Sequence, residues 1–151
     1  MGKSVSTSPL TCFKAYDVRG ELGVNFDTTI AYRIGRAVGQ HFSSGFVVIG
    51  CDARETSPEL AKAVVRGVCD AGLTVLDLGM AGTEEMYWAV TEFGATAGIE
   101  VTASHNPINY NGLKIVKSGS RPLDDKNDFQ VIKYLAEVSD WAEGAGVLDV
   151  I

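Results

Sequence analysis

Several features that would place the chain in a specialised class of protein are missing from its sequence. It has only three cysteines, Cys12, Cys51 and Cys69, and no Cys-x-x-Cys spacing, so paired disulfides and a zinc site are both poorly supported. The first ten residues, MGKSVSTSPL, lack the apolar core of a signal peptide, and no apolar run approaches the ~20 residues that span a bilayer. We therefore expect a soluble, cytoplasmic protein with reduced thiols and no membrane partner.

Basic residues are also in short supply. The chain has 13 Lys and Arg against 19 Asp and Glu, which gives a net charge of −6. A nucleic-acid partner would require a basic face, so we expect none. A site for a phosphate group must then be built locally, from a few placed cations and backbone N–H groups. With 151 residues, 46% hydrophobic and 21% charged, the chain has the size and composition of one ordinary globular domain.

Apolar periodicity predicts four helices and four strands after an irregular start. Residues 11–23 read as a strand-turn-strand or a loop because Arg19 and Gly20 interrupt an extended stretch. The third predicted helix begins with Thr83 as its cap and turns Met86, Val90 and Phe93 towards the core. The predicted helices cover residues 28–42, 57–71, 83–93 and 124–138, and the predicted strands cover 46–50, 73–79, 96–101 and 113–116.

This alternation of strands and helices predicts an α/β fold, a three-layer α/β/α domain with a mainly parallel mixed sheet. We expect residues 1–10 to be a flexible lead-in, residues 11–140 to form the domain, and residues 141–151 to be a linker towards a further domain. Ligands of such sheets bind beyond the carboxyl ends of the strands. The segments CDARETS, GMAGTEE and TASHNP are predicted to lie there.

The segment TASHNP combines several features expected of a reactive loop. Its small residues allow close approach to the backbone, and Pro107 and Asn106 fix the turn. Lys114 follows Ser104 by ten residues, so it can lie close to the Ser104 hydroxyl if the two strands are neighbours. A phosphoserine carries about −1.5 to −2 charge and needs such a cation. A solvent-exposed lysine is an equally good interpretation of Lys114 from the residues alone, and a hydrogen-bonded loop histidine is the better interpretation of His105.

A hydrolase is a further interpretation of these residues. A hydrolase with a nucleophile elbow would place glycines around the serine, whereas Thr102 and Asn106 flank Ser104 here. The chain has only two histidines, and His41 falls in a predicted helix, so a Ser-His-Asp triad is poorly served. In the segment FKAYDVRG, Arg19 could bind a phosphate and Tyr16 a sugar, but spacing alone favours an ion pair between Arg19 and Asp17.

Taken together, three segments make the sequence similar to a known enzyme family. VTASHNPINYNGLKIV resembles the phosphoserine loop of the α-D-phosphohexomutases, and FKAYDVRGELG resembles their N-terminal signature. GMAGTEEMYWAV is similar to bacterial members of the phosphomannomutase/phosphoglucomutase branch. The likeness extends from about Leu10 to Leu123 and implies that this chain is domain 1 of such an enzyme, an intramolecular phosphotransferase of carbohydrate metabolism.

The resemblance implies a role for each candidate residue. Ser104 would carry the phosphate and exchange it with a hexose 1- or 6-phosphate through a bisphosphate intermediate. His105 and Lys114 would assist proton transfer or neutralise charge, Arg19 would contact the transferring phosphoryl group, and Tyr16 would lie close to it. A Mg²⁺ ion would bind Ser104 through its phosphate, and a hexose 1,6-bisphosphate would act as activator.

The family's other parts do not occur in residues 1–151. The Mg²⁺ loop, the sugar-selecting loop and the distal phosphate site belong to the remaining phosphohexomutase domains, which are therefore expected partners, along with mannose or glucose phosphates. We expect the isolated chain to have little or no mutase activity. The alternative is a non-catalytic domain that binds a phosphosugar or a partner protein.

Overall fold

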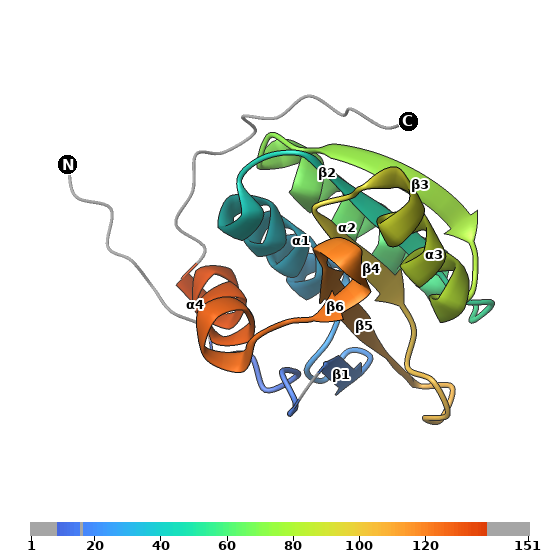
Figure 1. The fold of residues 1–151 in the computed structure, drawn as a ribbon. Coiled ribbons are helices and arrows are strands. Elements are labelled where there is room, and N and C mark those ends of the chain that lie inside the picture. Colours follow the sequence, from blue (N-terminus) through green and yellow to red (C-terminus); the bar gives the residue numbers. More distant parts are fainter. Residues whose placement is uncertain (1–8, 16, 139–151) are drawn as a thin grey trace.

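A mixed sheet of six strands, flanked on both faces by helices, organises the chain in the computed structural model, which describes residues 9–15 and 17–138 (Figure 1). The strand order is β1-β5-β4-β2-β3, with β6 paired to β5. The strands are β1 (Val18–Glu21), β2 (Phe46–Cys51), β3 (Thr74–Met80), β4 (Ala97–Val101), β5 (Tyr110–Lys117) and β6 (Arg121–Pro122). The predicted three-layer α/β/α fold with a mixed sheet is confirmed.

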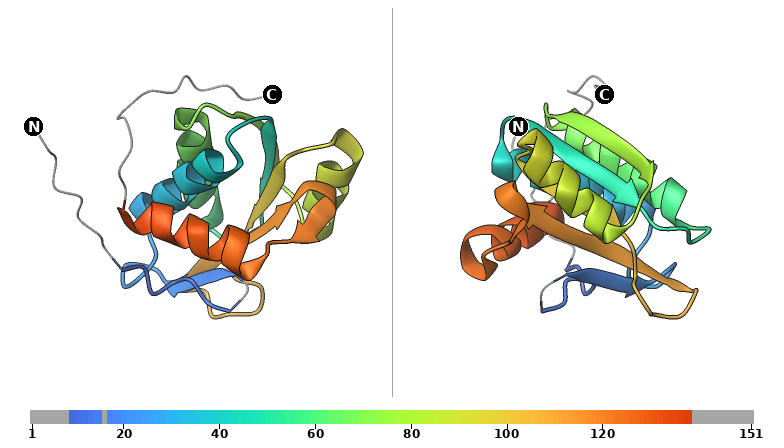
Figure 2. Two further views of the ribbon diagram at one scale, coloured as in Figure 1. Left: turned by 60° about the vertical axis from the view of Figure 1, so that its left-hand side comes forward. Right: turned by 45° about the vertical axis from the view of Figure 1, so that its right-hand side comes forward.

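Two apolar cores separate the helices into layers. Helices α1 (Thr28–Phe42), α2 (Ser57–Asp70) and α4 (Gln130–Val138) share one core with one face of the sheet. Helix α3 (Thr83–Phe93) covers the other face, over a smaller core that contains Val48 and Val116 (Figure 2). Alternate residues of the buried strands therefore serve different cores, as expected for a sheet covered on both sides.

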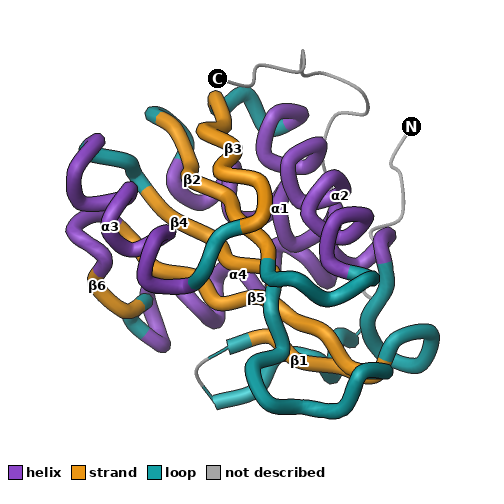
Figure 3. Tube along the Cα trace, turned by 90° about the vertical axis from the view of Figure 1, so that its right-hand side faces the viewer, coloured by secondary structure: helices purple, strands orange, loops and turns teal. Residues whose placement is uncertain are grey.

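The sheet changes direction at β4. Strands β3, β2 and β4 are parallel to each other, whereas β5 is antiparallel to β4, β1 and β6. Figure 3 shows the strands of the sheet lying side by side. The antiparallel share is larger than the cadence of strands and helices predicts, because residues 102–109 join β4 to β5 without a crossover helix. This short connection is the loop that carries Ser104.

Three local predictions need correction. Helix α3 is capped by Gly82 and not by Thr83, and the Glu85 carboxylate accepts the Gly82 N–H at 2.7 Å. Phe93 is 52% exposed, and its ring contacts Trp88 edge-on, so it does not face the core as Met86 and Val90 do. The last predicted helix begins as a π-helical turn, Asp125–Phe129, before α4.

The predicted bounds and N-cap of the first helix are confirmed. Asp27 caps α1 by accepting the Ile30 N–H at 2.9 Å, and α1 has the predicted bounds. The three cysteines are buried and are not joined by disulfides within the described residues, and burial raises the pKa of Cys12 to about 11. Within the described residues, none of the helices has the length and apolar character needed to cross a membrane. The predicted lead-in and linker lie almost entirely outside the described residues.

Candidate functional site

The carboxyl ends of the three parallel strands meet at one edge of the sheet, as predicted. The Asp52 N–H, just after β2, donates to the Val101 carbonyl of β4 at 3.0 Å. The Ala81 N–H, just after β3, donates to the Cys51 carbonyl at 2.9 Å. The segments CDARETS, GMAGTEE and TASHNP are therefore brought together here.

The loop between β4 and β5 presents Ser104 in a constrained conformation. Ser104 is exposed and has a φ of 54°, in the left-handed region that non-glycine residues seldom adopt. Its N–H donates to Thr102 Oγ1 at 3.0 Å. The backbone N–H and the side-chain amide of Asn106 both donate to the Ala103 carbonyl, at 3.0 and 2.8 Å. Thr102 and Asn106 thus fold the loop so that the serine stands at its tip.

Arg54, in the loop that follows β2, holds this turn through hydrogen bonds to its backbone. Its Nη1 donates to the carbonyls of Pro107 at 2.8 Å and Tyr110 at 3.1 Å. Its Nη2 donates to the carbonyls of Ser104 at 3.0 Å and Asn106 at 2.5 Å. Only 13% of the Arg54 side chain is exposed, and its Nε lies 3.7 Å from Asp52 Oδ2. One guanidinium therefore holds four carbonyls of the Ser104 loop.

A partly buried polar cluster supports Arg54 and the start of β5. Asp52 Oδ1 accepts the Arg54 backbone N–H at 3.0 Å and the Ser57 hydroxyl at 2.5 Å. The fully buried Asn111 donates to Ser57 Oγ at 3.0 Å and to Thr56 Oγ1 at 2.9 Å. These bonds connect the start of α2 to the strand that leaves the Ser104 loop.

Arg19 lies on β1 and shares a cavity with the Ser104 loop. Its Nε donates to Asp17 Oδ1 at 3.3 Å, so the ion pair favoured by spacing is confirmed, yet 41% of the Arg19 side chain remains exposed. A cavity of about 610 Å³ is lined by Arg19, Lys14 and Asn106, among others. Two cations thus face a space bordered by the Ser104 loop. An anionic group could be held there.

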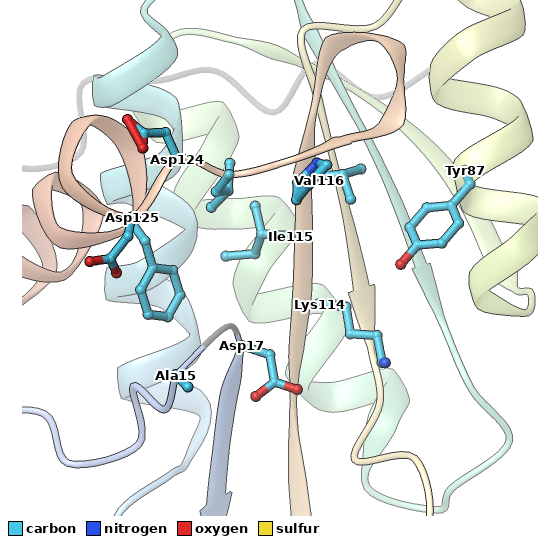
Figure 4. A pocket seen from close by; sticks show the side chains of 11 residues that line it. Ala15, Asp17, Tyr87, Lys114, Ile115, Val116, Asp124 and Asp125 are labelled. Carbon is cyan, nitrogen blue, oxygen red and sulfur yellow. The ribbon is translucent and has the colours of Figure 1, made fainter.

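Lys114 lies in the middle of β5, whereas the predicted strand 113–116 places it near the strand's beginning. It lines a second cavity, of about 370 Å³, with Asp17 and with Tyr87 of α3 (Figure 4). Ala15 lines both cavities, so the two spaces adjoin at this residue. On β5, Lys114 is two residues from Gly112, which pairs with Arg19, so Lys114 and Arg19 emerge on the same face of the sheet.

Gly112 explains why β1 can come so close to β5. A Cβ at this position would overlap the Val18 carbonyl oxygen, so only glycine allows this approach of the backbones. The Gly112 of the Asn-Gly-x-Lys motif therefore places Arg19 beside the strand that carries Lys114.

Glu100 is a buried residue on β4, four residues before Ser104. Its side chain on β4 is fully buried, and neither of its oxygens has a hydrogen-bond partner among the described residues. Burial, reinforced by the carboxylates of Asp52 and Glu85, raises the pKa of Glu100 to about 8. The residue is therefore largely protonated at neutral pH. Gly50 leaves space for it, because a Cβ there would lie 2.8 Å from Glu100 Oε1.

The predicted site residues differ in where they lie relative to Ser104 and the two cavities. Arg19 borders the cavity of the Ser104 loop, Lys114 lines the adjoining one, His105 is exposed beside Ser104, and Tyr16 lies outside the described residues. The sequence placed CDARETS at this edge but gave no role to Asp52 or Arg54, and Glu100 was also missed.

The described side chains do not form a Mg²⁺ site by themselves. Among the described residues there is no group of three or more His, Cys, Asp or Glu side chains that could hold a metal ion. A phosphate on Ser104 would add oxygen ligands, but Mg²⁺ requires near-octahedral coordination, so further ligands must come from elsewhere.

Comparison with known proteins places these features in a family. Residues 11–140 match the family model described as phosphoglucomutase/phosphomannomutase, alpha/beta/alpha domain I. The chain is 53% identical over 128 residues to phosphomannomutases from Klebsiella pneumoniae and Escherichia coli, a stretch that covers 85% of the chain in each case. A crystal structure of a phosphoglucomutase/phosphomannomutase family protein from Burkholderia thailandensis superposes with a TM-score of 0.72 at 37% identity, over 80% of this chain and 28% of that one.

The relatives differ in how much of their length is matched. The match covers 82% of the Klebsiella protein but only 28% of the Escherichia coli protein. The shared fold, the match to the family model and these identities lead to one conclusion: the chain belongs to the phosphoglucomutase/phosphomannomutase family, as its α/β/α domain I.

Proposed function

We propose that Ser104 is the phosphoryl carrier of a phosphomannomutase/phosphoglucomutase that interconverts hexose 1-phosphates and 6-phosphates. The observation that carries the proposal is the exposed hydroxyl at the tip of a constrained loop, beside a cavity lined by Arg19 and Lys14. The family relationship supports the same assignment, because the relatives at 53% identity are phosphomannomutases.

In the proposed reaction, a free hydroxyl of the hexose monophosphate attacks the phosphorus of phospho-Ser104. The new P–O bond to the sugar forms, the P–Oγ bond breaks, and Ser104 leaves as an alkoxide that takes up a proton. The hydroxyl proton of the sugar passes to a neighbouring base. The hexose bisphosphate then turns over in the site and returns its other phosphoryl group to Ser104 by the reverse step.

The proposal gives a role to each of the other candidate residues. Arg19 contacts the transferring phosphoryl oxygens, and Tyr16, which lies outside the described residues, is assigned a place near them. Lys114 and His105 neutralise charge or carry the proton. Phosphoryl transfer depends mainly on positioning and on neutralisation of oxygen charge, so fixed cations at the rim of the loop suit the reaction.

Three further parts of the proposal concern the complete enzyme. Mg²⁺ would bind the Ser104 phosphate together with ligands outside this chain, and would supply charge neutralisation. A hexose 1,6-bisphosphate would restore the phosphate on Ser104 when it is lost. The remaining phosphohexomutase domains would complete the sugar site, and the whole protein would work in the cytoplasm.

A domain exchange tests the proposal. Residues 11–138 of this chain replace the matching segment of the Escherichia coli phosphomannomutase, and mannose 6-phosphate formation is followed in a coupled assay with Mg²⁺ and a hexose bisphosphate. We expect activity with Ser104, loss of at least ~10³-fold in Ser104→Ala, and a phosphate adduct by intact mass only when the serine is present. A well-folded chimera that binds hexose phosphate but neither turns it over nor acquires a phosphate would instead favour a non-catalytic phosphosugar-binding domain.

A further inference from the structure

Arg54 is the most heavily engaged polar side chain at the carboxyl edge of the sheet, although it does not belong to the segments that carry the family resemblance. Its Nη1 and Nη2 atoms donate to four carbonyls, at 2.5–3.1 Å, all in the stretch between Ser104 and Tyr110. Its Nε lies closest to Asp52, and only 13% of the side chain is exposed. The Arg54 guanidinium is thus bonded to the backbone of the loop, whereas Arg19 lines the cavity.

The contacts of Arg54 also orient the peptide groups of the loop. No cis peptide bond occurs in the described chain, and in a trans peptide the N–H points opposite to the C=O. Because the carbonyls of Ser104 and Pro107 point to the guanidinium, the N–H groups of His105 and Ile108 point away from it. The negative ends of these peptide dipoles therefore face Arg54, and the positive N–H ends face the opposite side of the loop. Outward N–H groups of this kind favour the binding of an anion.

The backbone conformation of Ser104 requires hydrogen bonds that hold it in place. A left-handed φ of 54° is unfavourable for serine and persists only when surrounding contacts impose it. The Ser104 N–H is held by Thr102, and the Ser104 carbonyl by Arg54. Loss of the guanidinium would release the carbonyl side of the serine and leave three other loop carbonyls without this donor.

We infer that Arg54 is a positioning residue, which holds the Ser104 loop in the one conformation that aims the Ser104 hydroxyl at its phosphoryl donor and acceptor, without touching the phosphate. This inference deepens the proposed function and depends on it only for the transfer step. Asp52 in turn holds Arg54. Asp52 Oδ1 accepts the Arg54 backbone N–H at 3.0 Å, and Asp52 Oδ2 lies 3.7 Å from Arg54 Nε.

Amide exchange of the 151-residue chain tests the positioning directly, without any need for activity. We expect the amides of Ser104, Asn106 and Tyr110 to exchange at least about tenfold faster in Arg54→Ala, while the amides of β2 and β4 keep their protection. Arg121→Ala is the matched control, because the exposed Arg121 side chain bonds to no described residue other than Ser118. Arg54→Lys should fall between, since an ammonium cannot reproduce the planar fork that spans four carbonyls.

Guanidinium ion distinguishes a specific role from general loss of packing. Added at concentrations well below those that unfold the protein, it should restore protection to the loop amides of Arg54→Ala, whereas NaCl at the same ionic strength should not. If Arg54→Ala loses protection throughout β2 and β4, it has failed to fold, and Arg54→Gln and Arg54→Lys take its place in both measurements.

The chimera described above tests the catalytic consequence. Arg54→Ala should lower kcat about 100-fold and change KM only a few-fold, since misplacement of the nucleophile affects the chemical step more than binding. Unchanged loop exchange in Arg54→Ala, or a loosened loop with undiminished kcat, would overturn the inference. An inactive chimera that retains Arg54 and Ser104 would count against the proposed function instead, and the exchange data would then decide whether Arg54 positions the loop.

Discussion

Glu100 is placed in an environment that opposes its ionisation. It lies on β4, four residues before Ser104, with both oxygens unpartnered among the described residues. Its pKa is raised from 4.5 to about 8, first by burial and then by the carboxylates of Asp52 and Glu85. Between these two pH values the folded protein holds a proton that the unfolded chain has released. Linkage then requires the free energy of unfolding to fall as the pH rises through this range.

We expect Glu100→Gln to remove this pH dependence. The contribution of Glu100 is fully present below about pH 4.5 and is lost as the pH passes about 8, with a slope approaching ~1.4 kcal/mol per pH unit inside that range. Urea unfolding at pH 5, 6, 7 and 8 should therefore show a decline for the native chain and a flatter profile for the variant. Glu92→Gln, at an exposed position of α3, is the control and should retain the native slope. Equal slopes in all three proteins would contradict this account of Glu100.

The residues of the candidate site were predictable from sequence to different degrees. Ser104 could be found because Thr102, Asn106 and Pro107 mark a constrained turn after a buried strand. Arg54 could not, because its acceptors are backbone carbonyls about 50 positions away, and carbonyls leave no signature in a sequence. Glu100 was hidden for a related reason: in a strand covered on both faces, alternation does not reveal how deeply a carboxyl is buried.

At the level of elements, the packing of α1 against α2 depends on glycines. A Cβ on Gly35 would overlap the Val64 carbonyl oxygen, and one on Gly67 would overlap the Tyr32 carbonyl oxygen and lie 2.6 Å from the Arg36 nitrogen. Glycine inside a helix costs about 1 kcal/mol relative to alanine. The close approach of the two backbones must therefore contribute more than the glycines lose.

Gly67→Ala should consequently destabilise the domain. The gain in helix propensity, about 1 kcal/mol, is smaller than the cost of forcing two helix backbones apart, and we expect a net loss of ~1–3 kcal/mol. Chemical denaturation measures the difference. Gly82→Ala serves as control: a Cβ there would meet only the end of the Glu85 side chain, at 3.6 Å, and the change should cost less than about 1 kcal/mol. A Gly67→Ala protein as stable as the native chain would show that the helices can separate freely.

Element bounds followed from local pattern where the pattern was strong and failed where pairing was distant. The four predicted helices carry apolar residues at helical spacing, and all four occur. Strand β5 is longer than the predicted 113–116 because Tyr110, Asn111 and Gly112 pair with β1, some ninety residues earlier. Nothing in the polar stretch Asn109–Gly112 signals a strand, so this extension depends on tertiary pairing.

At the scale of the whole molecule, the proposed function makes this chain one part of a larger reaction site. It matches only 28% of the Escherichia coli phosphomannomutase, and its described residues do not include a cluster that could bind a metal ion unaided. The cavity of about 610 Å³ beside the Ser104 loop is lined by Lys14, Arg19 and Glu21, and a hexose phosphate held there would lack the contacts that the proposed function assigns to further domains. Because phosphoryl transfer gains most of its rate from positioning and charge neutralisation, the missing contacts should reduce turnover severely.

The 151-residue chain by itself should therefore show less than about one-thousandth of the turnover of the complete Escherichia coli enzyme, since removal of the metal ligands and sugar contacts abolishes several large contributions at once. Both proteins are assayed for mannose 6-phosphate formation from mannose 1-phosphate with Mg²⁺ and a hexose bisphosphate, at equal molar concentration. The chimera with residues 11–138 of this chain should recover activity, which shows that the domain itself is competent. Turnover of the isolated chain close to that of the complete enzyme would mean that its own residues suffice to hold the sugar and neutralise the phosphate.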